Sequence, residues 1–93
     1  MQIALSTTYT FEGKEYAELT FDFDSLTGRD VINAEKEARA LGDNSPLPEF
    51  SKTYQAVLAA KAAKVPVDMI MSLNGKDFTR VTVLVQNFLL EEA

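Results

Sequence analysis

The sequence predicts an α+β fold in which an N-terminal β-hairpin is followed by three to four α-helices packed on one face. Three observations lead to this class. Apolar and polar residues alternate over residues 2–23, which is typical of half-buried strands. After Thr27 the apolar residues instead recur every three or four positions, which is typical of amphipathic helices. Glycines and prolines mark the boundaries between these segments.

Residues 1–24 are predicted to form the hairpin. Glu12 and Gly13 supply its turn, because glycine adopts a positive φ without steric cost. Asp22 and Asp24 are expected on the solvent face of the second strand. The inward-facing residues are expected to be Ile3 and Leu5 in the first strand, and Ala17, Leu19, Phe21 and Phe23 in the second.

The first helix is predicted over residues 27–42. Thr27 is suited to the N-cap, because its hydroxyl can accept a backbone N–H of the first turn, and Asp30 favours the positive end of the helix dipole. Gly42 supplies a C-terminal stop. The apolar face of this helix comprises Val31, Ala34, Ala38 and Leu41.

Residues 49–92 are predicted to form a helical, partner-binding region after a turn-rich loop over residues 42–49. An alanine-rich second helix starts at Phe50 and must end before Pro66, which lacks an N–H. Pro66 suits the first turn of a short helix that runs through Leu73. The pair Asn74-Gly75 then predicts a stop or a turn.

Residues 79–87 of the last segment permit two interpretations. Their apolar residues match helical spacing, but Thr79, Val81, Val83 and Val85 also alternate as in a strand. The apolar face continues to Leu89, which is longer than a typical strand of about 5–6 residues. A helix is therefore predicted, with a strand as the alternative.

Composition narrows the functional classes. The chain of 93 residues fits a single domain, residues 1–93, and its net charge of −5 argues against nucleic-acid binding. It contains no cysteine and no histidine, which excludes thiolate and imidazole chemistry. We therefore expect no enzyme, no cofactor and no metal site.

The sequence also indicates where the protein is located. No apolar run approaches the roughly 18 residues of a membrane span, and residues 1–6 do not resemble a secretory signal. We therefore expect a cytoplasmic protein.

An apolar surplus suggests where a partner binds. The run around Pro66 holds more apolar residues than one face of a short helix can bury, and methionines adapt to varied partners. Core filling is the alternative for each residue. The predicted partner-binding residues are Met69, Ile70, Met71 and the exposed part of the stripe Phe78, Val85 and Leu89.

Short motifs in a fixed order resemble one protein family. They are Phe11-Glu12-Gly13-Lys14-Glu15-Tyr16, Leu26-Thr27-Gly28-Arg29-Asp30 running into Ala34-Glu35-Lys36-Glu37-Ala38, then Val65-Pro66, and finally Asp77-Phe78 with Val85 and Phe88-Leu89. This order resembles the bacteriophage tail assembly chaperones, and it covers nearly the whole chain. The alanine- and lysine-rich stretch of residues 50–64 departs from the family pattern.

The resemblance implies a non-catalytic protein of the infected host's cytoplasm that binds the phage tape measure protein. It would keep this long protein soluble and yield to the major tail protein as the tail tube polymerises. Self-association is also expected, because many copies along one client give avidity. The alternative is a structural phage tail component, or a small phage-encoded inhibitor, that also acts by protein binding.

Overall fold

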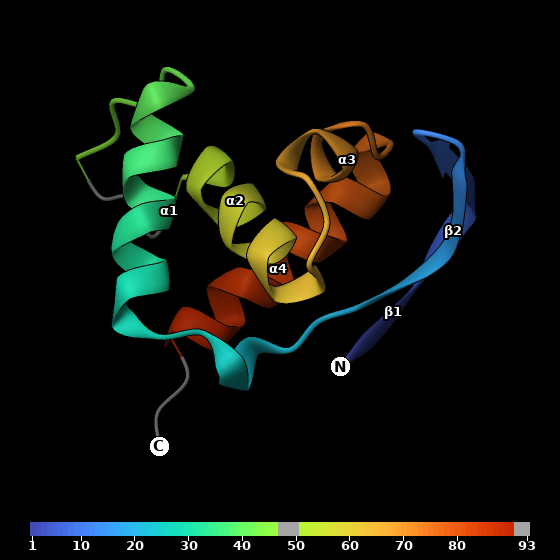
Figure 1. The fold of residues 1–93 in the computed structure, drawn as a ribbon, viewed down its shortest axis with the longest axis horizontal. Helices are drawn as coiled ribbons and strands as arrows, with labels where there is room; N and C mark the ends of the chain where they lie inside the picture. The colour runs from blue at the N-terminus through green and yellow to red at the C-terminus, as the bar shows by residue number, and fades with distance from the viewer. Residues whose placement is uncertain (47–50, 91–93) are drawn as a thin grey trace.

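The computed structural model describes residues 1–46 and 51–90, and it has the predicted α+β architecture. A two-stranded antiparallel hairpin lies at one side of the molecule, and the helices all lie on the other side of it (Figure 1). In chain order the elements are β1 (Gln2–Phe11), β2 (Lys14–Thr20), the 3-10 turn η1 (Phe23–Ser25), α1 (Gly28–Ala40), α2 (Lys52–Ala63), α3 (Val67–Met71) and α4 (Gly75–Leu90).

The hairpin turn forms where the sequence predicts it. Glu12 and Gly13 connect the strands, with φ angles of 51° and 79°. A two-residue loop with a positive φ at both positions matches the right-handed twist of the strands. Glycine adopts this conformation at no steric cost, whereas Glu12 is held in it by the hairpin.

A β-bulge divides the hairpin into two parts. Near its base Ala4 pairs with Glu18, and near its tip Tyr9 pairs with Tyr16. Residues 5–8 of β1 therefore lie opposite residue 17 of β2, so the strands are out of regular register there. Such a bulge bends the strand and redirects its backbone groups away from the partner strand.

The predicted hairpin boundary at residue 24 is wrong, because β2 ends at Thr20. Thr20 pairs with Gln2, the first residue of β1, and Phe21 exchanges backbone hydrogen bonds with Met1, so the residues after Phe21 have no partner left in the hairpin. The backbone N–H of Asp22 instead donates to the carbonyl of Ala62 in α2, at 3.0 Å. Phe21 is buried, and Phe23 is half-buried in η1 rather than in a strand.

Helix α1 begins and ends as the sequence predicts. The Thr27 hydroxyl accepts the backbone N–H of Asp30, and the Asp30 carboxylate accepts the backbone N–H of Thr27, which completes a capping box. At the other end Gly42, with φ of 102°, closes the last turn. The prediction that Leu41 continues the buried face is wrong, because Leu41 is the C-cap and is 52% exposed.

Removing the cap of α1 is expected to destabilise the protein modestly. Thr27→Ala leaves the N–H of Asp30 without its acceptor, so the free energy of unfolding should fall by about 1 kcal/mol. Urea denaturation measures this change, with Thr8→Ala, at an exposed position of β1, as the control. Equal stability of the two variants would contradict the assigned role of the cap.

Helix α2 is the centre of the fold. It packs against α1, α3, α4 and β2, and it is buried on nearly every side. The alanines that depart from the family pattern explain this placement, because small side chains allow the neighbouring helices to approach closely. The buried residues of α2 are Tyr54, Gln55, Ala56, Val57, Leu58, Ala59, Ala60 and Ala62.

The end of α2 and the start of α3 follow the prediction. Lys64 adopts a left-handed conformation after α2, and Pro66 is the N-cap of α3. Asn74 and Gly75 lie where the chain turns from α3, which ends at Met71, into α4. The Asn74 side chain accepts the backbone N–H of Asp77, and Gly75 is the first residue of α4. Residues 47–50 and 91–93, which include the predicted start of the second helix at Phe50, lie outside the described residues.

Helix α4 settles the choice between helix and strand for residues 79–87. It is one continuous helix, Gly75–Leu90, and Asp77, Val81 and Val85 are buried along one face of it at intervals of four residues. The β-branched residues do not prevent this conformation, because the gain from burying this face outweighs their small helix penalty.

Candidate functional site

A buried carboxylate joins the hairpin to α4. Asp77, in the first turn of α4, has no exposed surface, and its Oδ2 lies 3.0 Å from the Ser6 nitrogen, 2.8 Å from the Ser6 hydroxyl and 2.9 Å from the Tyr9 hydroxyl. Arg80 approaches Oδ1 at 3.3 Å and also donates to the carbonyl of Ala4. The β-bulge makes this arrangement possible, because it directs the N–H of Ser6 away from β2.

The cluster around Asp77 keeps its carboxyl ionised. Burial acts to raise the pKa of Asp77, but hydrogen bonds from Ser6 and Tyr9, together with the positive charge of Arg80, outweigh it. The pKa of Asp77 therefore lies below its ordinary value. An ionised carboxylate that accepts hydrogen bonds from a strand stabilises the fold.

The six predicted partner-binding residues divide into two groups. Met69, Ile70 and Val85 are completely buried and belong to the hydrophobic core. Met71 is 42% exposed at the end of α3, whereas Phe78 and Leu89 are half-buried against the core. Only these last three can contact a partner without disturbing the fold, and their role in binding stays a prediction.

A row of stacked phenylalanine rings lies between η1 and the C-terminal half of α4. The centroids of Phe21 and Phe23 are 5.5 Å apart, and those of Phe23 and Phe88 are 5.0 Å apart. Phe21 is fully covered, whereas Phe23 and Phe88 keep exposed surface. The two exposed rings form part of the wall of an open pocket of about 540 Å³.

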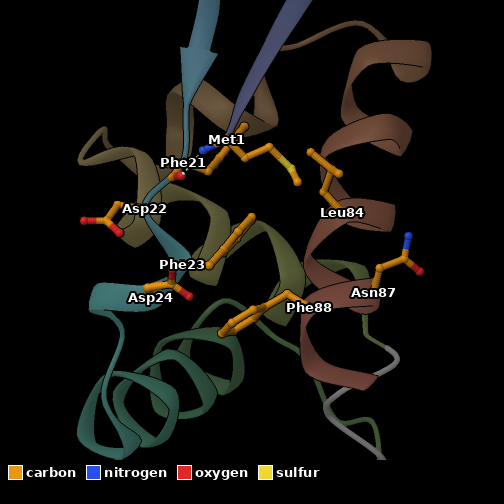
Figure 2. Close-up of a pocket in the computed structure, with 8 residues that line it drawn as sticks. All are labelled: Met1, Phe21, Asp22, Phe23, Asp24, Leu84, Asn87 and Phe88. Carbon is orange, nitrogen blue, oxygen red and sulfur yellow. Dashed lines mark hydrogen bonds between the residues drawn. The ribbon is translucent and has the colours of Figure 1, made fainter. Parts of the chain in front are cut away.

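This phenylalanine pocket has an apolar interior and an acidic side. Figure 2 shows the Met1 side chain reaching toward Leu84, with the rings of Phe23 and Phe88 below them, and the carboxylates of Asp22 and Asp24 on the side opposite α4. The lining residues are Met1, Phe21, Asp22, Phe23, Asp24, Leu84, Asn87 and Phe88.

Exposed apolar residues of α4 flank Asn87 at the edge of the pocket. Val83 and Leu90 are 43% and 54% exposed, and they share one side of the helix with Asn87 at the spacing i, i+4 and i+7. The sequence interpretation missed this outer face, because it assigned one apolar stripe of α4 to both the core and the partner. Val83 and Leu90 are apolar but lie off that stripe, and this could have indicated a second, exposed apolar face.

The lysines of α2 make contacts within the fold. The Lys52 ammonium donates to the Thr82 hydroxyl at 2.7 Å, and Lys61 pairs with Glu37 of α1 at 3.1 Å. The Lys61–Glu37 pair is partly exposed and adds at most about 1 kcal/mol. These contacts tie α2 to α4 and α1.

The comparison with protein families agrees with the order of motifs in the chain. A family model described as "Phage tail assembly chaperone proteins, E, or 41 or 14" matches residues 2–90. The chain belongs to this family. It is a family of assembly proteins rather than of enzymes. Searches of curated proteins and of solved structures found no significant match.

The residues that carry the family resemblance have structural roles in this tail assembly chaperone. Glu12 and Gly13 make the hairpin turn, Thr27 caps α1, and Asp77 holds the hairpin against α4. These motif residues shape the fold, whereas Phe88, which also belongs to the motifs, lines the phenylalanine pocket and keeps exposed surface.

Residues 1–46 and 51–90 of the tail assembly chaperone hold neither a membrane-spanning helix nor a cluster of metal ligands. None of the described helices combines the length and the apolar composition that crossing a bilayer requires. Within the same part of the chain, no group of three or more acidic side chains is placed to hold a metal ion.

Proposed function

We propose that this tail assembly chaperone binds the phage tape measure protein in the host cytoplasm and keeps it soluble until the tail tube polymerises around it. It acts by binding and not by catalysis. The major tail protein displaces the chaperone as the tube grows. The family match is the single observation that carries this proposal, because it places the chain among tail assembly proteins.

The surface of the chaperone is suited to such a client. Long helical proteins expose apolar stripes, and a partner can cover them with an apolar groove of its own. The chaperone presents the phenylalanine pocket and the exposed side chains of Val83 and Leu90 along α4, with Met71 on α3. Its net charge of −5 adds solubility to a complex that carries many copies.

Co-expression with the tape measure protein of the same phage tests the proposed function. With the wild-type chaperone, most of the tape measure protein should stay in the soluble fraction and co-purify with the chaperone. An unrelated acidic protein of similar size is the control for a general effect of charge. If the tape measure protein is equally soluble with this control, or pellets despite the chaperone, the proposed function is wrong.

The self-association of the purified chain distinguishes a chaperone from a structural tail component. Light scattering after size exclusion measures the mass of the chaperone alone over a range of concentrations. A transient chaperone should shift from small to larger species as concentration rises. A ring of fixed mass at every concentration would favour the structural alternative.

A further inference from the structure

We propose that the phenylalanine pocket receives an amphipathic helix of the client in which apolar anchor residues are flanked by lysine or arginine. This inference rests on the proposed function, since it names the chemistry of the client segment. Three features of the described residues support it: the apolar interior of the pocket, the charge around it and the shape of the surface that continues from it.

The pocket has the size and composition of a binding site for apolar anchors. Its volume of about 540 Å³ falls within the roughly 300–1,000 Å³ of typical binding pockets. Phe23 is held between the stacked rings of Phe21 and Phe88, and Phe88 stacks on Phe23, while both Phe23 and Phe88 keep some exposed surface. A rigid aromatic surface loses little conformational entropy on binding, so an inserted leucine or phenylalanine gains contact area at low cost.

The charge around the pocket selects for a basic partner. Asp22 and Asp24 are exposed, and no lysine or arginine lies among the lining residues. Met1, which also lines the pocket, carries the N-terminal ammonium, and this group already donates to the carbonyl of Phe21 at 2.9 Å. A lysine or arginine beside the apolar anchors would therefore meet two carboxylates, and an acidic flank would be repelled.

The outer face of α4 favours a helix as the occupant. Val83, Asn87 and Leu90 follow the helix axis past the pocket, so an incoming helix can lie along α4 and place successive anchors against it. Exposed apolar side chains at this spacing are what a facing helix covers. The pocket would then hold the anchor at one end of the contact.

Two synthetic helical peptides test the proposed chemistry on the full chain. Both carry the same leucine and phenylalanine face, but one has lysine flanks and the other has glutamate flanks. In an NMR titration at low salt, the lysine peptide should bind at least about tenfold more tightly and shift the signals of Phe23, Leu84, Asn87 and Phe88. This preference should shrink in high salt, which screens exposed charges.

Two variants and a matched control assign the effect to the pocket. The double variant Asp22→Asn and Asp24→Asn should remove most of the preference for the lysine peptide, and Asn87→Arg should abolish its binding because the added positive charge repels the lysine flanks. Glu15→Gln with Glu18→Gln, both exposed on β2, changes the net charge equally and should leave binding unchanged. Equal affinity for both peptides, or signal shifts confined to other surfaces, would overturn the proposal.

Co-expression with the tape measure protein separates the pocket from the function. If the wild type keeps the client soluble and the Asn87→Arg variant does so equally well, the pocket assignment is wrong while the proposed function stands. If the wild type fails to bind the client but the pocket still selects the lysine peptide, the proposed function is wrong and the pocket chemistry is supported.

Discussion

Replacing Asp77 by alanine is expected to lower the free energy of unfolding by about 2–4 kcal/mol. The variant leaves the N–H and hydroxyl of Ser6 and the hydroxyl of Tyr9 without the acceptor that they share. It also leaves the Arg80 guanidinium without its ion pair. Since these bonds connect the hairpin to α4, the hairpin should detach more readily than the helices unfold from one another.

Graded variants measure how much of this loss comes from each bond. Urea denaturation should rank Asp77→Ala as the most destabilised variant, Asp77→Asn as intermediate and Tyr9→Phe as the least destabilised. Tyr9→Phe removes one of the hydrogen bonds to Asp77, and the loss of a single hydrogen bond should lower the free energy of unfolding by about 0.5–1.5 kcal/mol. Asp24→Asn, at an exposed carboxylate, is the control. An Asp77→Ala variant as stable as this control would refute the structural role of the cluster.

The Asp77 cluster also predicts a pH dependence. The pKa of Asp77 is lower in the folded state than in the unfolded state. The contribution of Asp77 to the free energy of unfolding is therefore complete above the unfolded-state pKa of about 3.9, and it is lost as the pH falls through the folded-state pKa. The pKa of Asp43 is also lowered, chiefly by the Ser45 side chain. This effect is the same in the wild type and in an Asp77→Asn variant, so it cancels when their unfolding free energies are subtracted.

The measured quantity is the difference in unfolding free energy between the wild type and Asp77→Asn. We expect this difference to be constant from pH 8 to about pH 5 and to shrink as the pH falls below about 4. A difference that stays constant, or grows, down to pH 3 would show that the carboxyl is not held ionised by the fold.

Introducing a charge at Ile70 is expected to destabilise the protein strongly. The Ile70 side chain is completely buried, so Ile70→Asp places a carboxylate in the core without a partner. The cost should reach about 4 kcal/mol or more, against a total stability of about 5–14 kcal/mol for a chain of this size. Circular dichroism and thermal unfolding will measure the loss directly.

Met71→Asp is the matched control for this variant. Met71 adjoins Ile70 in α3 but is 42% exposed, so its replacement should cost less than about 1 kcal/mol. If Ile70→Asp folds as well as Met71→Asp, Ile70 is not a core residue, and the sequence-based assignment of Ile70 to the partner surface regains support.

Local signals in the sequence predicted most of the secondary structure. The turn at Glu12-Gly13 and the cap at Thr27 depend on residues only a few positions apart, so they can be recognised without the fold. The Asp77 cluster could not be predicted in this way. Its partner Ser6 lies 71 positions away, and the bulge that exposes the Ser6 N–H has no clear sequence signature.

The partner surface was harder to predict than the core. Periodicity showed that Val85 lies on an apolar face, but it could not show that this side chain is completely buried in the fold, where α4 packs against α2. The phenylalanine pocket joins η1 to α4, and it forms because the chain leaves β2 after Thr20 and places Phe23 against Phe88. Such a contact between distant segments depends on tertiary packing.

Site-specific photo-cross-linking tests the central claim that the client lies along α4 at the phenylalanine pocket. A photoreactive phenylalanine derivative is placed at Asn87, and at Lys36 on the exposed side of α1 as the control. Irradiation of the complex with tape measure protein should give a covalent adduct from position 87 and none from position 36. An adduct from position 36 alone, or none at position 87 in a complex that forms, would contradict the claim.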